Sequence, residues 1–255
     1  IQKLCGWIKD KRAEKVELCL DPKSRTEWLV ALRTLGDGLY TYTHTKPSAK
    51  PHSVQLTLCV NDLTKAKPVV HEVQACLHGV ALAREWGNRP PNHATPTDLG
   101  IAAKALGKMK NMSCEVLGPA QIAKLNMGAF MAVAQASAQP AAFIVLQYKG
   151  AGSSAAPTVL VGKGITFDTG GISLKPGPGM DEMKFDMCGA ASVLGTFRAL
   201  AELQPRINVV GLIPACENMP GGKAVKPGDV VTSASGQTIE ILNTDAEGRL
   251  ILSDA

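Results

Sequence analysis

Short, continuous apolar runs in the second part of the chain constrain its fold more than any other sequence feature. Strands that are covered on both faces have this composition, and stretches with helical patterns separate the runs. The strands that we predict from them lie at 114–117, 142–148, 158–161, 207–213 and 237–242. One predicted helix spans 189–203, and another begins at Gly248. Strands that alternate with helices imply a three-layer α/β/α domain with a mostly parallel central sheet.

The first 68 residues have the pattern of a smaller, partial α/β domain. We predict strands at 16–20 and 54–60, because apolar residues alternate in the second of them. The residues at 26–39 between these strands are typical of a helix. A loop is predicted at 43–53, which is rich in proline, lysine and histidine.

A connecting helix is predicted at 69–86, where apolar residues recur at helical spacing. The sequence Asn-Arg-Pro-Pro-Asn at 88–92 ends this helix. The next helix begins with a capping box, in which Thr95 caps the helix, Pro96 suits its first turn and Asp98 closes the box.

Composition bounds the class of protein. The 255 residues are 45% hydrophobic, which is enough apolar material for a sizeable core. The net charge of +5 comes without a dense basic stripe, and the mixed-sign run at 9–15 is expected to form a solvated surface. Charge alone therefore does not indicate nucleic acid as a partner. No signal peptide or bilayer-length apolar run occurs, so we expect a cytoplasmic protein without a membrane partner.

Seven cysteines are present, an odd number, without a C-x-x-C motif. This usage is typical of reduced, buried thiols in a cytosolic protein. Cys188 is expected to have a packing role rather than to act as a nucleophile. The five histidines form no HExxH motif, and neither a phosphate-binding loop nor a Gly-x-Ser-x-Gly elbow occurs.

Acidic and basic residues gather in two glycine-containing segments, one of which follows the last predicted strand. They are four carboxylates, two lysines and an arginine: Asp168, Asp186, Asp245, Glu247, Lys163, Lys175 and Arg249. Charged acids after a buried strand are costly unless cations neutralise them. This inventory fits a site for two divalent cations. From the residues alone, the carboxylates could also merely cap helices or pair with the lysines, although their placement among glycines at strand ends favours a metal site. Arg249 could pair with Asp245 or Glu247.

Three long motifs carry a resemblance to a known family. They are VGKGITFDTGG at 161–171, KFDMCGAA at 184–191 and NTDAEGRL at 243–250, and they follow the NRPPN segment in order. From about residue 69 onward, the chain closely resembles the leucyl (cytosol) aminopeptidase family of two-metal exopeptidases. The resemblance implies a partial N-terminal domain and linker at 1–68 and a catalytic metallopeptidase domain at 69–255. Family members are nearly twice as long, so we expect this catalytic domain to be incomplete at its C-terminus.

The resemblance also implies a set of metal ligands. Lys163, Asp168, Asp186 and Glu247 would hold a tight site, and Asp168, Asp245 and Glu247 a more exchangeable one. A lysine coordinates a metal only as the neutral amine, so this role requires a lowered pKa of Lys163. Carboxylate ligands are compatible with manganese, zinc, magnesium and cobalt.

Two cations would serve catalysis by the same resemblance. Lys175 would polarise the scissile carbonyl and stabilise the oxyanion. Arg249 would hold a bicarbonate that acts as general base toward a metal-bridging water. The implied reaction releases N-terminal, preferentially leucine-like residues from peptides, and the implied assembly is a homohexamer. Two alternatives stay open: a hexameric DNA-binding or architectural protein with the same fold, although no sequence feature supports DNA binding, and a catalytically inert fragment.

Overall fold

A parallel pair of strands, crossed by a helix, forms the N-terminal unit. The structure is a computed structural model that describes residues 1–20, 22, 24–46, 48 and 53–255. The elements of this unit are α1 (Gln2–Lys11), β1 (Lys15–Cys19), α2 (Arg25–Leu39) and β2 (Gln55–Cys59). β1 and β2 pair in parallel, and the Ser24 hydroxyl accepts a hydrogen bond from the Glu27 N–H (3.2 Å) to cap α2.

The predicted strands and the helix of this unit are confirmed within one or two residues, but α1 was not predicted. Its mixed charges occupy the exposed side, whereas Cys5 and Ile8 are buried. The predicted loop at 43–53 falls partly on residues 47 and 49–52, which lie outside the described residues. No helix or strand is assigned to the described residues of that stretch.

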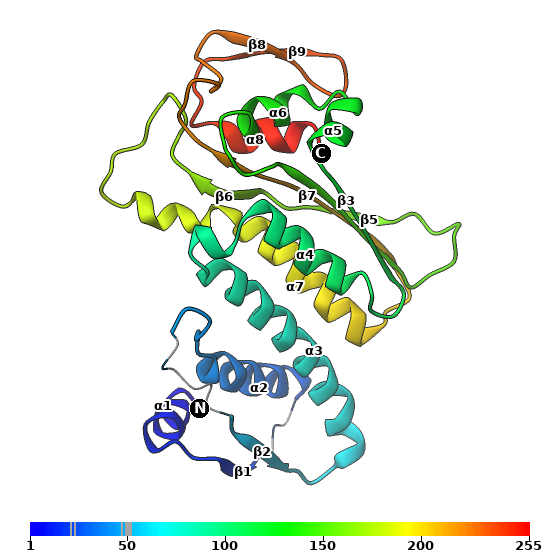
Figure 1. Cartoon of the computed structure of the whole chain (residues 1–255). Helices are drawn as coiled ribbons and strands as arrows, with labels where there is room; N and C mark the ends of the chain where they lie inside the picture. Colours follow the sequence, from blue (N-terminus) through cyan, green and yellow to red (C-terminus); the bar gives the residue numbers. More distant parts are fainter. Residues whose placement is uncertain (21, 23, 47, 49–52) are drawn as a thin grey trace.

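The long helix α3 (Leu63–Asn88) joins the N-terminal unit to the rest of the molecule (Figure 1). It begins six residues before the predicted start, because the Asp62 carboxylate accepts hydrogen bonds from the N–H groups of Thr64 and Lys65 (3.0 and 3.1 Å). The first part of α3 contacts α2, and its second part packs along α7 (Cys188–Leu203).

The central sheet has five strands, of which four run in the same direction. They are β3 (Met112–Leu117), β4 (Ala142–Lys149), β5 (Thr158–Val161), β6 (Gly164–Asp168) and β7 (Asn208–Asn218). The order is β3-β4-β7-β5, and β6 pairs with β7 beyond the end of β5. Only β4 runs in the direction opposite to the other four strands. The prediction of a mostly parallel sheet therefore holds for strand direction, with β4 as the exception.

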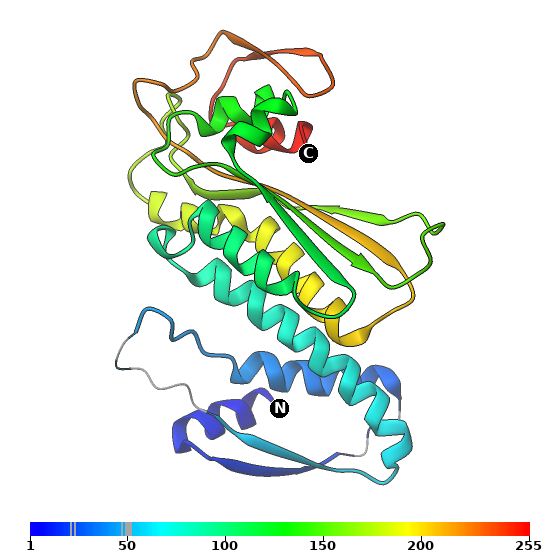
Figure 2. The same ribbon diagram turned by 45° about the vertical axis from the view of Figure 1, so that its right-hand side comes forward.

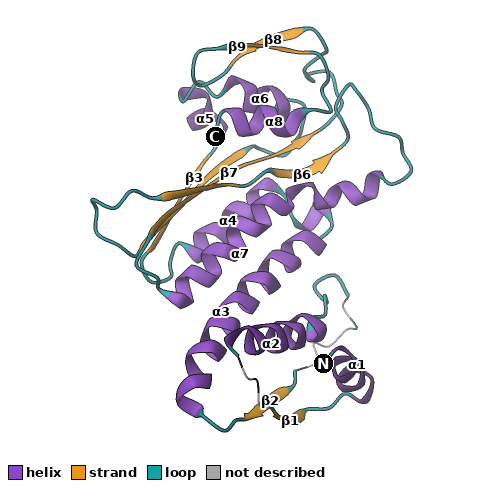
Figure 3. Cartoon of the chain, turned by 180° about the vertical axis from the view of Figure 1, so that it is seen from behind, coloured by secondary structure: helices purple, strands orange, loops and turns teal. Residues whose placement is uncertain are grey.

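Helices cover both faces of this sheet, which confirms the α/β class and its three layers. Figure 2 shows α3, α4 and α7 on one face, and the view from behind in Figure 3 shows α5, α6 and α8 on the other. The helices not yet bounded are α4 (Pro96–Leu106), α5 (Pro119–Lys124), α6 (Gly128–Ala134) and α8 (Glu247–Ser253). Successive residues of β4 enter different cores: Phe143 packs with α6, and Ile144 packs with α7. This double burial explains the uninterrupted apolar sequence of the strand.

The capping box predicted for α4 is present. The Thr95 hydroxyl accepts from the Asp98 N–H (3.2 Å), and the Asp98 carboxylate accepts from the Thr95 N–H (3.0 Å). Two 3-10 helices, η1 (Pro91–His93) and η2 (Met180–Met187), precede α4 and α7 respectively.

The last predicted strand exists, but it does not belong to the central sheet. β9 (Thr238–Ile241) pairs only with β8 (Asp229–Thr232), in a separate antiparallel hairpin that lies beyond α6 and α8 (Figure 1). The expectation that residue 245 follows a strand of the central sheet is thus wrong. A short apolar strand pattern indicates burial but does not identify the strand's pairing partner.

Candidate metal centre

An interruption in one edge of the sheet positions Lys163. β5 and β6 pair with successive halves of β7, and Gly162 and Lys163 lie between them. The Gly162 N–H still donates to the Leu212 carbonyl (2.9 Å), and the Lys163 carbonyl accepts from the Ala190 N–H (2.9 Å) at the start of α7. A Cβ on Gly162 would lie 2.7 Å from the Gly189 carbonyl oxygen, so only glycine allows α7 to approach this closely.

Asp168 and Asn218 end two adjacent parallel strands and are paired in register. Asp168 is 2% exposed, and its Oδ1 accepts hydrogen bonds from the Gly170 N–H (2.9 Å) and from Nδ2 of Asn218 (2.8 Å). The chain then turns sharply at Gly170 and Gly171, whose φ angles are 85° and 68°. Glycine adopts these angles at little cost, whereas other residues are strained there.

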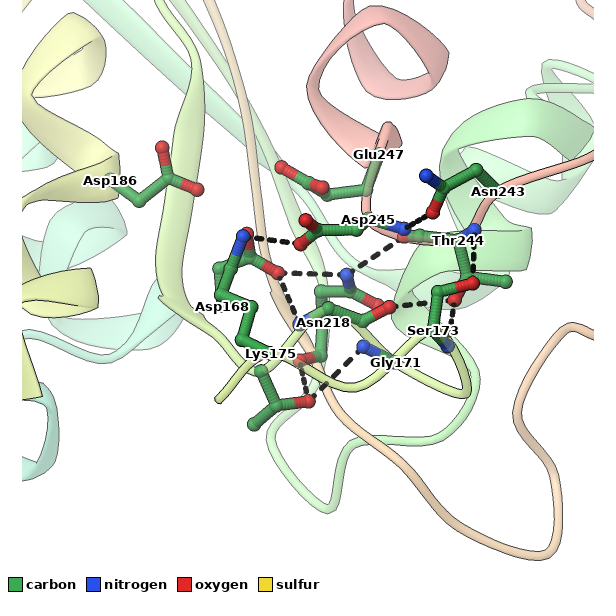
Figure 4. A network of polar contacts seen from close by, with 12 residues as sticks. Asp168, Gly171, Ser173, Lys175, Asp186, Asn218, Asn243, Thr244, Asp245 and Glu247 are labelled. Carbon is green, nitrogen blue, oxygen red and sulfur yellow. Dashed lines mark hydrogen bonds and ion pairs between the residues drawn. The ribbon is translucent and has the colours of Figure 1, made fainter. Parts of the chain in front are cut away.

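The loop after Asp168 is tied to the segment before α8 by reciprocal hydrogen bonds. The Thr244 hydroxyl donates to the Gly170 carbonyl (2.6 Å) and accepts from the Ser173 N–H (2.8 Å), while the Ser173 hydroxyl accepts from the Thr244 N–H (3.2 Å). Nδ2 of Asn218 also donates to the Thr244 carbonyl (3.1 Å). Two segments that are about 70 residues apart in sequence are thereby held side by side, as Figure 4 shows.

Each lysine lies between two carboxylates. Nζ of Lys163 contacts Asp186 (2.8 Å) and Glu247 (2.7 Å), and Nζ of Lys175 contacts Asp168 (2.9 Å) and also Asp245. Six of the seven charged groups that the sequence singled out therefore meet at one place, and Arg249 is the exception. In Figure 4, Asp186 lies to one side of the other carboxylates, on η2.

Three of the four carboxylates are close enough to share one ion. Asp168, Asp245 and Glu247 each offer an oxygen within 4.8 Å of the other two, and no second group of three or more potential ligands is found among the described residues. Histidines and cysteines take no part in this group. Asp186 is outside it and joins the cluster through Lys163.

Two buried oxygens of the cluster lack a hydrogen-bond partner. They are Oε2 of Glu247 and Oδ2 of Asp186, and no other buried side-chain oxygen or nitrogen among the described residues is without one. Leaving a buried carboxylate oxygen unpaired is costly, and a hard divalent cation satisfies such atoms well. The donor set thus fits a metal centre better than it fits a simple network of ion pairs.

The electrostatics favour charged lysines in this structure. Burial acts to lower the pKa of Lys163, but hydrogen bonds and charge from Asp186 and Glu247 outweigh it, so the pKa is raised. The pKa of Lys175 is raised in the same way by Asp245 and Asp168, against the effect of burial. Burial raises the pKa of Glu247 and of Asp186, although Lys163 opposes that shift. The ion pairs alone therefore do not produce the lowered pKa of Lys163 that metal coordination requires.

Arg249 and Cys188 lie outside the network. The Arg249 side chain is exposed, lines a groove with Ile239 and Ala246, and has no hydrogen bond or ion pair to the cluster. The alternative that Arg249 pairs with Asp245 or Glu247 is not supported, because it forms no ion pair or hydrogen bond with either residue. Partial burial and, to a smaller extent, the charge of Asp186 raise the pKa of the Cys188 thiol. A raised pKa lowers the fraction of thiolate, so Cys188 is poorly suited to act as a nucleophile.

Sequence reasoning missed Asn218 and Thr244. Asn218 is 2% exposed, and its amide donates to both halves of the site. A polar residue at the end of the long apolar run of β7 was the available signal, but the predicted strand stopped five residues earlier, at 213.

Replacement of Asn218 with leucine should destabilise the protein. Leucine has a similar size but donates neither hydrogen bond, which leaves the buried Thr244 carbonyl unsatisfied. We expect a loss of about 1–3 kcal/mol in the free energy of unfolding. Urea unfolding measures it, with the exposed Asn61→Leu as the matched control. Equal unfolding midpoints for the two variants would contradict the inference that the Asn218 amide holds Asp168 and the Thr244 segment together.

The fold and the site together define an α/β/α protein with a carboxylate-rich candidate metal centre. Residues 81–255 match the cytosol aminopeptidase family, catalytic domain. The chain is 66% identical over 226 residues to a probable cytosol aminopeptidase of Acidovorax ebreus (88% of this chain, 46% of the relative). It is 58% identical over 250 residues to a probable cytosol aminopeptidase of Verminephrobacter eiseniae (97% of this chain, 48% of the relative). The chain belongs to the cytosol aminopeptidase family, and it spans about half the length of these relatives.

Proposed function

We propose that the complete protein is a two-metal aminopeptidase that hydrolyses the N-terminal peptide bond of peptides and prefers leucine-like residues. The observation that carries this proposal is the cluster of four carboxylates with two unpartnered buried oxygens, in a chain of the cytosol aminopeptidase family. The relatives' names support the reaction class. The preference for leucine-like residues rests only on the resemblance to the leucyl aminopeptidase family that the motifs at 161–171 and 243–250 carry.

The proposed ligands divide between two sites. Lys163, Asp168, Asp186 and Glu247 would hold one cation, and Asp168, Asp245 and Glu247 the other, with manganese or zinc as the first candidates and magnesium or cobalt also compatible. Divalent cations acidify water and polarise a carbonyl when they are bound at such a site. The hydrogen bonds to Asp168 from Gly170 and Asn218 would keep its carboxylate oriented.

Lys175 is proposed as the electrophile. Its ammonium group lies between the Asp168 and Asp245 carboxylates. From there it would donate a hydrogen bond to the oxygen of the scissile carbonyl, where negative charge develops. Arg249 is proposed to hold bicarbonate as the general base, since its exposed guanidinium can offer a bidentate fork to a planar anion.

Replacement of Lys175 with methionine should separate catalysis from metal binding. The change removes the charge but keeps a side chain of similar length, so we expect unchanged metal content and a kcat that is about 100- to 1,000-fold lower. Metal analysis and steady-state kinetics provide the two measurements. Lys223→Met, at an exposed position, is the control. Loss of metal from the Lys175 variant would instead indicate a structural residue.

The assembly and location are part of the same proposal. We propose a cytoplasmic homohexamer that acts on peptides. Among the described residues, no helix has both the length and the apolar character needed to cross a membrane.

The test uses the complete protein, dialysed against a chelator and then titrated with manganese or zinc. We expect hydrolysis of a leucine anilide to stop on chelation and to return with metal. Acetylation of the substrate's α-amine should abolish the reaction, because an aminopeptidase requires a free N-terminus. No hydrolysis by the metal-loaded protein would overturn the proposal, and salt-dependent DNA binding would then be measured.

A further inference from the structure

Two cysteines face each other on the outer side of the N-terminal sheet. Cys19 and Cys59 are the last residues of β1 and β2, and they are direct partners in the parallel register. Both are exposed, whereas the preceding residues, Leu18 and Leu58, are less exposed and belong to the opposite face. Successive side chains of a strand point to opposite faces, so the two thiols share one accessible side of the sheet.

The spacing of paired strands suits a disulfide. Neighbouring strands lie about 4.7–4.9 Å apart, and disulfides join Cα atoms about 4.4–6.8 Å apart. The Cα spacing of these register partners is therefore within the range that a disulfide requires.

The other cysteines have different surroundings. Cys216 is fully buried, and the buried Cys5 thiol lies against the Thr34 and Leu35 carbonyls. Among the described strand pairings, no other two cysteines are partners in register. Cys19 and Cys59 thus form a distinct accessible dithiol, in place of the buried, inert thiols that the composition predicted.

We propose that Cys19 and Cys59 are a reversible dithiol–disulfide site for low-molecular-weight disulfide oxidants. The thiolate of one cysteine attacks a sulfur of the oxidant, which forms a mixed disulfide and releases one thiol. The second cysteine gives up its proton and attacks the protein sulfur of the mixed disulfide, which releases the second thiol. The two protein thiols lose two electrons and two protons, and the oxidant disulfide gains both.

The product would covalently join the ends of β1 and β2. The bond would close the chain segment that contains α2, which packs on the first part of α3. Figure 1 places this sheet at the end of the molecule opposite α8, the helix that begins with Glu247. The inference therefore stands independently of the proposed peptidase function.

The test oxidises the complete protein with glutathione disulfide, alkylates the remaining thiols under denaturing conditions and maps the products by mass spectrometry. Within this chain, we expect the number of alkylated cysteines to fall from seven to five, with one cross-linked peptide pair that contains residues 19 and 59. Dithiothreitol should restore all seven.

Single variants distinguish this site from unspecific oxidation. Cys59→Ser should abolish the cross-link and leave Cys19 with a mixed glutathione disulfide, whereas Cys76→Ser should leave the cross-link intact. Seven alkylated cysteines after oxidation, or a cross-link through any other pair, would overturn the proposal.

Discussion

Replacement of Glu247 with glutamine should remove metal from the protein and abolish its peptidase activity. Glu247 is 2% exposed, one of its oxygens contacts Lys163 and the other has no partner. Glutamine keeps the shape but removes the negative charge and places an N–H₂ group where an oxygen ligand is needed. We expect kcat/KM to fall by more than about 100-fold, because even residues one step removed from a metal contribute 10- to 100-fold.

Glu240→Gln is the matched control for this result. Glu240 lies in β9, only seven residues earlier, and its side chain is exposed. Elemental analysis and hydrolysis of a leucine anilide, measured together with the thermal midpoint, separate loss of metal from unfolding. A Glu247→Gln variant that kept the parental metal content and rate would show that Glu247 is not a ligand.

Replacement of Gly79 with alanine should strongly destabilise the packing of α3 on α7. A Cβ added at Gly79 would lie 2.4 Å from the Gly195 carbonyl oxygen. In the same way, a Cβ added at Gly195 would lie 2.5 Å from the Gly79 carbonyl oxygen. The two helix backbones touch here, so neither can move without disturbing the core beneath them. We expect a loss of about 1–3 kcal/mol or more in the free energy of unfolding, as is typical of overpacked interiors.

Gly6→Ala provides a control of opposite sign. Gly6 is also within a helix, but a Cβ there would meet no atom within 4 Å. Alanine should stabilise that helix by about 0.5–1 kcal/mol, because it loses less backbone entropy on folding. Urea unfolding of both variants gives the comparison, and a Gly79→Ala midpoint at or above that of the parent would contradict the close helix contact.

Sequence reasoning predicted most elements of the fold where the local pattern was strong. The strand at 158–161 and the capping box at Thr95 agree with the structure residue by residue. β6 was missed because it is a short edge segment rich in polar and glycine residues around Lys163 and Asp168. β8 was not predicted, and β9 was assigned to the central sheet because an apolar pattern indicates which residues of a strand are buried but not which strand it pairs with.

The candidate site was predicted as a list of residues rather than as an arrangement. Asp168, Asp245 and Glu247 do come together, and Lys163 and Lys175 each join two carboxylates. Arg249 belongs to the same motif as Asp245, yet its side chain faces a different groove. Two positions apart on a helix is about 200° of rotation, so Glu247 and Arg249 cannot share one face of α8.

The sequence by itself determined the α/β class, the local caps and turns, and the family, because periodicity, capping chemistry and motifs are encoded over a few consecutive residues. Only the tertiary structure decided that the loop after β6 and the segment before α8 are joined through Asn218 and Thr244. The tertiary structure also leaves one carboxylate oxygen of Asp186 and one of Glu247 without a hydrogen-bond partner, and it places Cys19 beside Cys59. These features depend on distances between residues far apart in the chain, and such distances are set by packing of the whole core.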